Sequence, residues 1–359
     1  QALWTPLAPH LRGIHTLHVV THGELHLLAL QDGAPAALQV CHYPGLVFYW
    51  LQRRRAAAAE PATPPAVPLD AGAQPAVALQ AHSPANDEEL PPIPFVHAEA
   101  RALQALWQHV QPIEHDRPLR VALLHLAGHG QAGQGQDAGV LVGPGQTLGL
   151  HEVLRSGLKA DIVYLSACLV GRTSEDLDGD PLGMLSALFL RGARQIVAPL
   201  VPVSDFDAPL LAILFHLALK AQPGGRLDAH RALHEAKAQL RSGEWPAPAE
   251  DLVRQAYLPI VQEVVEDVLA QGATGALDPH NEVGRLMAQW LEPASDFFDV
   301  QAAEHGPVAA VFARGGGAEA GAQAALQLLL RNRRRLHLQP GVQALLRYVG
   351  VFGAPGPAG

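Results

Sequence analysis

Cysteine is scarce in this sequence of 359 residues, which contains only Cys41 and Cys168. Small secreted domains that depend on disulfides carry many more, so the composition excludes a disulfide scaffold and favours a reducing compartment, the cytoplasm. The sequence also lacks any apolar run near the roughly 18 residues that indicate a membrane span, and it lacks a charged-then-apolar leader. We therefore expect a cytoplasmic protein with no membrane partner.

Charged residues are also few, at 16% of the chain, and the formal net charge is −9. Nucleic-acid-binding domains usually carry a basic face, so this balance argues against nucleic acid as a direct partner. Hydrophobic residues make up 48%, which is enough for a sizeable core in one large domain or two. The chain starts with Gln1 rather than Met, so we expect a processed or partial chain.

The apolar pattern predicts an α/β fold. Continuous apolar runs indicate buried strands, and helical spacing appears between and after them. Buried strands that alternate with helices imply βαβ units and a mainly parallel sheet. In chain order, the predicted strands are 17–21, 119–126, 162–165, 195–201 and 345–352, and the predicted helices are 45–51, 97–111, 181–190, 207–221, 228–240, 251–271 and 318–331.

Two of the predicted strands end in reactive residues. One runs into His125-Leu-Ala-Gly-His129-Gly130, and the other into Leu165-Ser-Ala-Cys168. Ligands bind at the carboxyl ends of strands in open parallel sheets, so these ends can bring His129 and Cys168 together. An imidazole beside a thiol takes its proton and makes a nucleophilic thiolate, and the N–H of Gly130 is a candidate oxyanion donor. A free cysteine after a strand is also commonly a small core residue, which is the alternative interpretation.

Both motifs resemble those of the CHAT domain, which belongs to the caspase–separase group of cysteine peptidases. The His motif corresponds to 125–130 and the Cys motif to 165–171. Further stretches at 19–28, 192–205 and 345–353 resemble the family's opening strand, supporting strand and closing strand. The resemblance implies a caspase-like α/β/α sandwich on a mainly parallel sheet, with an added helical subdomain.

The resemblance also implies how the site works. His129 is the expected general base and Cys168 the nucleophile. His125 and Ser166 are expected to contact these two residues and hold them in place without touching the substrate. No cofactor and no metal is expected. The expected partners are a protein substrate and a regulatory protein or attached sensor or repeat region, and the family suggests a role in bacterial defence or cell death.

The substrate pocket is expected to involve Leu169 and Asp205. Leu169 and Val170 stand where the family more often has an acidic residue and Thr, which makes the rim of the pocket more apolar. Asp205 has an ordinary alternative role, as a cap of the helix that starts near Asp207. Acidic side chains dominate 175–180, so we expect an uncharged or basic residue before the cleaved bond.

Composition and resemblance together suggest a division of the chain. The expected parts are an N-terminal strand and helix over 1–55, an Ala- and Pro-rich linker or loop over 56–92, a core with both motifs over 93–245, a helical insertion over 246–340, and a closing strand and tail over 341–359.

Several residues also fit other sites. Gly128 to Gly133 matches the dinucleotide pattern G-x-G-x-x-G, but a helix must then begin at the third glycine, and 134–149 indicates a loop or hairpin instead. His125 and His129 are spaced like metal ligands on a helix, whereas the run before them is a strand. Three further groups suggest sites by their composition: a metal site at His15, His18, His22 and His26, a calcium loop at 175–180, and an anion site at 333–335. Solvated or hydrogen-bonded side chains are the better interpretation of all three.

Two competing functions remain. A CHAT-like fold can act as a non-catalytic interaction or scaffold module, in which case Cys168 is an ordinary thiol. A nucleotide-binding α/β protein is the third interpretation, and it predicts measurable binding of a dinucleotide.

Overall fold

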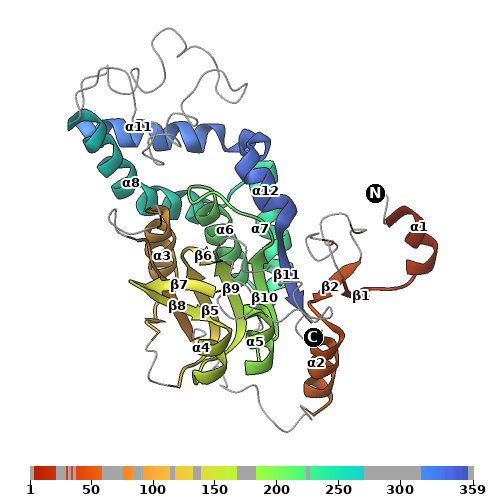
Figure 1. Ribbon diagram of the computed structural model, residues 1–359. Helices are drawn as coiled ribbons and strands as arrows, with labels where there is room; N and C mark the ends of the chain where they lie inside the picture. Colours follow the sequence, from red (N-terminus) through yellow and green to blue (C-terminus); the bar gives the residue numbers. More distant parts are fainter. Residues whose placement is uncertain are drawn as a thin grey trace.

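The computed structural model describes residues 4–21, 30, 34, 38–58, 76–84, 90, 92–113, 118–131, 139–167, 183–223, 227–270 and 317–354. Within these ranges the chain forms one large sheet of eight strands in the order β1-β2-β11-β10-β9-β5-β3-β4 (Figure 1). The strands are β1 (Thr16–Val20), β2 (Gln39–Tyr43), β3 (Val77–Ala81), β4 (Val110–Gln111), β5 (Arg120–Ala127), β9 (Lys159–Ser166), β10 (Gln195–Pro199) and β11 (Val349–Gly353).

Strand pairing in this sheet is mainly parallel. The pair β10 and β11 is antiparallel, and the other pairs are parallel. The long strands β5 and β9 lie near the centre, and most of their residues after the first are buried. Strands buried on both faces show continuous apolar runs, which is why sequence patterns locate them well.

Helices cover both faces of the sheet, so the fold is an α/β/α sandwich (Figure 1). One core cluster joins the sheet to α3, α6 and α7, and the other joins it to α2, α4 and α5. The predicted fold class is confirmed. The bounds are α2 (Leu46–Ala58), α3 (Phe95–Leu106), α4 (Leu150–Arg155), α5 (Met184–Arg191), α6 (Ala208–Lys220) and α7 (Ala229–Ser242).

A small antiparallel sheet follows β5. It consists of β6 (Gly130–Gln131), β7 (Gly139–Gly143) and β8 (Gln146–Gly149), in the order β6-β7-β8. The sequence predicts a loop or hairpin over 134–149, and the described part of this range, 139–149, is a hairpin. Since β6 occupies the position directly after Gly128 and His129, the hairpin determines where the His motif lies.

The remaining elements lie at the two ends of the chain. A short helix α1 (Trp4–Leu7) and the 3-10 turn η1 (Ala8–Leu11) precede β1. A helical region follows α7, and it consists of α8 (Ala247–Ala270), α11 (Gly317–Asn332), the 3-10 helix η6 (Arg333–Leu338) and α12 (Pro340–Tyr348). None of the described helices is long and apolar enough to cross a membrane.

The helical region packs directly on the sheet's own helices. The side chain of Tyr257 on α8 is fully buried, and its hydroxyl donates to the carbonyl of Phe206 at 2.7 Å. Its ring contacts those of Phe95 and Phe206, with centroids 5.2 Å away in both cases. This aromatic group ties α8 to the start of α3 and to the segment after β10.

Some sequence predictions were wrong in detail. The segment 56–92 is predicted to be a linker or loop, but its described part contains β3, a largely buried strand that pairs with β5. The predicted helix 97–111 ends at Leu106, where Trp107 turns extended, and Val110–Gln111 is β4. The predicted strand 345–352 is a strand only from Val349, because Pro340 starts helix α12. Strand β2 was not predicted.

We predict that Tyr257→Ala lowers the free energy of unfolding by about 3–5 kcal/mol, because it empties a large buried site that joins α8 to the core. Chemical denaturation measured by circular dichroism checks this. Leu338→Ala is the matched control, since Leu338 is exposed, and it should change stability by less than about 0.5 kcal/mol. Equal effects of the two substitutions would contradict the observed docking of α8.

Candidate active site

The carboxyl ends of three parallel strands are level at one edge of the sheet. Ala127 of β5 is in register with Ala81 of β3 and with Ser166 of β9. Hydrogen bonds continue one residue further: His82 N donates to Ala127 O at 3.0 Å, and Gly128 N donates to Ser166 O at 3.2 Å. The chain therefore leaves the sheet with the two predicted motifs side by side.

His129 is held by the hairpin that follows it. The side chain is half-buried, and the carbonyl of His129 accepts a hydrogen bond of 2.9 Å from the N–H of Leu141. Gly128 allows this approach, because a Cβ at that position would lie 2.5 Å from the backbone oxygen of Leu141. A side chain at Gly128 would thus push β7 away and displace His129.

Gly130 is the first residue of β6 and lies opposite Val140. In antiparallel pairs, hydrogen-bonded and non-hydrogen-bonded positions alternate. Since His129 and Leu141 share a hydrogen bond, Gly130 occupies a non-hydrogen-bonded position, and its N–H points away from β7. This orientation suits the predicted role of Gly130 as an oxyanion donor.

The nucleophile candidate, Cys168, lies outside the described residues. The preceding residues Ser166 and Ala167 are described, and Ala167 is buried. The expected pocket residue Leu169 and the acidic segment 175–180 also lie outside the described part of the chain. The structure therefore places His129 and the strand that leads to Cys168.

A buried polar cluster lies under this edge of the sheet. Glu99 on α3 has a side chain only 1% exposed, and His125 on β5 is fully buried. Glu99 Oε1 lies 2.9 Å from His125 Nε2, and the hydroxyl of Ser166 on β9 donates to Glu99 Oε2 at 2.9 Å. The carboxyl group of Glu99 thus contacts both β5 and β9, the strands that lead into the two predicted motifs.

The contact between Glu99 and His125 is close but not well aligned. Neither Glu99 Oε1 nor His125 Nε2 makes a hydrogen bond of good geometry with any described group. Buried polar atoms are costly to leave without a partner, so we regard their mutual contact as the interaction that offsets their burial.

The cluster continues from His125 to α6 and to the end of α3. His125 Nδ1 lies 3.0 Å from His216 Nε2, and Trp107 Nε1 donates to His216 Nδ1 at 3.0 Å. The ring of His125 also stacks on that of Tyr164, with centroids 4.9 Å away and planes 13° from parallel. Burial, with a smaller contribution from His125, lowers the pKa of His216 well below its usual value, so His216 is neutral.

Sequence reasoning predicted His125 and Ser166 as supporting residues but missed the group that joins them. Glu99 lies on a helix face that is otherwise apolar, beside Ala98, Ala102 and Leu103. A single acidic residue on the buried face of an amphipathic helix is the signal that could have identified it.

Asp205 does act as a cap, but of a different helix than expected. Its Oδ2 accepts a hydrogen bond of 3.1 Å from the backbone N–H of Phe95, at the start of α3. Helix α6 instead follows Asp207, whose side chain makes no capping hydrogen bond. The suggested role of Asp205 in a substrate pocket stays a prediction.

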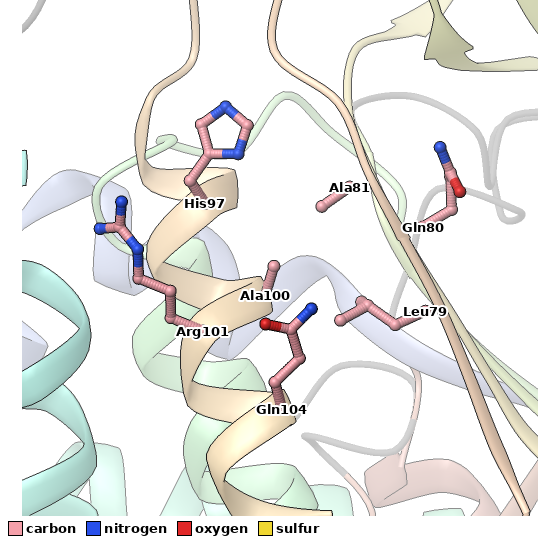
Figure 2. A pocket seen from close by; sticks show the side chains of 7 residues that line it. All are labelled: Leu79, Gln80, Ala81, His97, Ala100, Arg101 and Gln104. Atoms are coloured by element: carbon pink, nitrogen blue, oxygen red, sulfur yellow. The ribbon is translucent and has the colours of Figure 1, made fainter. Parts of the chain in front are cut away.

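A cavity of about 550 Å³ opens between α3 and β3 (Figure 2). Leu79 and Ala81 point from the strand towards the helix, whereas Gln80 points away (Figure 2). None of the predicted site residues that the structure describes lines it, so we assign it no role in catalysis. Its lining residues are Leu79, Gln80, Ala81, His97, Ala100, Arg101 and Gln104.

The competing motifs find explanations in the fold. Strand β6 (Gly130–Gln131) lies inside the glycine-rich pattern, and the first described helix after it is α4, which begins at Leu150. His18 lies 3.1 Å from the hydroxyl of Tyr43, as a hydrogen-bonded histidine would, while His22 and His26 lie outside the described residues. Arg333 pairs with Glu250 at 2.7 Å. Among the described residues, no group of three or more potential ligands could hold a metal ion.

A mainly parallel sheet is covered by helices on both faces, and the His motif and the residues that lead to Cys168 end neighbouring strands at one edge. This is the arrangement of an α/β protein of the caspase-like class. The family profile of the CHAT domain matches residues 1–257. The chain therefore belongs to the CHAT domain family of caspase-like cysteine peptidases. No curated protein matches the sequence.

We predict that Cys41 does not react with iodoacetamide in the native protein at pH 7. Its thiol is fully buried, and burial, with a smaller effect of Asp228, raises its pKa to about 12. The thiolate is the reactive form. Mass spectrometry of the Cys168→Ala variant, which keeps only Cys41, should show labelling in urea and none without it. Rapid labelling of native Cys168→Ala would contradict the burial of Cys41.

We predict that Asp207→Asn stabilises the protein more at pH 7.5 than at pH 4.5. Burial raises the pKa of Asp207 to about 6, above the value of about 3.9 in an unfolded chain. The native state then holds this proton more tightly. The resulting stabilisation is complete below about pH 4 and is lost as the pH rises to about 6.

Urea denaturation at both pH values measures the effect. At pH 7.5, removing the buried charge should add about 1–3 kcal/mol to the free energy of unfolding, and the gain should shrink at pH 4.5. Equal gains at both pH values would show that the pKa of Asp207 is not raised by folding.

Proposed function

We propose that this protein is a cysteine endopeptidase in which His129 activates Cys168. The observation that carries the proposal is the register of β5 and β9, which pairs Ala127 with Ser166. Each predicted catalytic residue follows two residues after a member of this pair. Membership of the CHAT family supports the same pairing of a histidine and a cysteine motif.

The proposed reaction has two steps. His129 takes the proton of Cys168, and the thiolate attacks the carbonyl carbon of the scissile peptide bond. The N–H of Gly130, which points away from β7, stabilises the oxyanion. His129 then protonates the leaving amine, and water hydrolyses the thioester to release the acid and regenerate the thiol.

We further propose the partners and the substrate preference. The substrate is a protein with an uncharged or basic residue before the cut, because 175–180 is acidic and follows Cys168 closely in sequence. Activity depends on a regulatory partner or an attached sensor region, in bacterial defence or cell death. These proposals come from the family and from residue chemistry, and the reaction itself needs no cofactor.

Proteolysis of a mixed-sequence peptide library tests the dyad. Cys168→Ala removes the nucleophile and should abolish cleavage, while His129→Ala should slow it by about 10²–10⁴-fold because the general base is lost. Mass spectrometry of the products reads both the rate and the residue before the cut.

The matched control is Cys41→Ala, which removes the other, buried thiol and should leave the rate within about twofold of the wild type. Cleavage that persists in Cys168→Ala would refute the proposal. A wild type that cleaves no peptide, with Cys168 no more reactive than an ordinary thiol, would favour the scaffold function.

A further inference from the structure

The buried polar cluster has a fixed hydrogen-bond direction. An indole N–H is only a donor, so the bond from Trp107 Nε1 requires His216 Nδ1 to be the acceptor. A neutral imidazole with an acceptor Nδ1 carries its proton on Nε2. His216 therefore donates from Nε2 to His125 Nδ1.

The same reasoning determines which ring nitrogen of His125 carries the proton. Because His125 Nδ1 accepts from His216, the proton of His125 lies on Nε2, which faces Glu99 Oε1 at 2.9 Å. The other oxygen of Glu99 receives the hydroxyl proton of Ser166. A carboxyl group can accept at both oxygens, so Glu99 accepts from Ser166 at Oε2 and faces the N–H of His125 in a close but poorly aligned contact at Oε1.

We propose that Glu99 is a positioning residue for the active site. Its carboxylate holds Ser166, two residues before Cys168, and His125, four residues before His129. It thereby fixes the two strand ends to each other and to α3. The expected effect on turnover rests on the proposed function. The proton positions inferred for His216 and His125 do not depend on that function.

The chemistry of the site argues against a role in packing alone. Burying a carboxylate costs free energy that apolar residues of similar size avoid, and such replacements are often neutral or stabilising. Glu99 nevertheless occupies the sheet-facing side of α3, beside apolar neighbours. Its two contacts go to the strands that lead into the catalytic motifs.

Turnover per active site separates positioning from stability. Buried Cys41 reacts with iodoacetamide only in unfolded chains, so the fraction of chains with unlabelled Cys41 counts the folded sites. A variant that only folds poorly then loses sites but keeps its turnover number. Glu99→Ala should lower kcat per folded site by about tenfold to a hundredfold, because small displacements of reacting groups are costly, and should leave KM within about threefold. Unchanged kcat per folded site would overturn the proposal.

Three further variants sharpen the comparison. Glu99→Gln keeps an oxygen for His125 and an amide that can donate to the Ser166 hydroxyl, so it should restore kcat to within about threefold of the wild type. Ser166→Ala breaks one contact and should show a smaller loss than Glu99→Ala. Gln104→Ala, on the exposed side of the same helix, is the control and should match the wild type. Equal kcat values for Glu99→Gln and Glu99→Ala would overturn the proposal.

Proton positions give a readout that needs no activity. Long-range ¹H–¹⁵N spectra of histidine-labelled protein at pH 7 should show His125 and His216 as neutral Nε2–H tautomers, assigned with His125→Gln and His216→Gln. A doubly protonated His125, or a proton on Nδ1 of either ring, would refute the hydrogen-bond directions inferred for this cluster. If the wild type cleaves nothing without a regulatory partner, the proposed function is judged by whether Cys168 reacts faster than an ordinary thiol. The alkylation rate of Cys168 then replaces kcat, and an equal rate in Glu99→Ala would refute positioning.

Discussion

The parallel register of β5 and β9 is the constraint on which the rest of the site depends. Seven residue pairs connect the two strands, and the last of them, Ala127 with Ser166, lies at the edge where both motifs begin. A shift of one strand by one residue against the other would place His125 and Ser166 on opposite faces of the sheet. Their contacts with Glu99 are possible only in the observed register, so the buried cluster and the register support each other.

The cluster also connects the site to the rest of the molecule. Glu99 lies on α3, whose first turn is capped by Asp205 from the segment after β10. Phe95 on the same turn packs against Tyr257 of α8. The contact between Tyr257 and Phe95 therefore joins the helical region after α7 directly to α3, the helix that carries Glu99.

Much of this arrangement could be predicted from the sequence, for identifiable reasons. Strands β5, β9 and β10 are buried on both faces, so continuous apolar runs revealed them, and Gly192 marked the end of α5 with a φ of 113°. Strand β3 was missed because its residues Val-Ala-Leu-Gln-Ala resemble the Ala-rich stretch before them. Helix α12 was mistaken for strand because the run Tyr-Val-Gly-Val-Phe begins at its last residue. Glu99 is visible in the sequence as an acidic residue on an apolar helix face, but its partners could not be predicted, because they come from β5 and β9, which only the folded sheet brings to α3.

The central claim is that the level strand ends form a thiol–imidazole pair, and the pH dependence of Cys168 alkylation tests it most directly. In the wild type, Cys168 should react with an apparent pKa well below the ordinary thiol value of about 8.5, because a neighbouring imidazolium stabilises the thiolate. In His129→Ala, the apparent pKa should return to about that ordinary value. The same pH profile in both proteins would contradict the account.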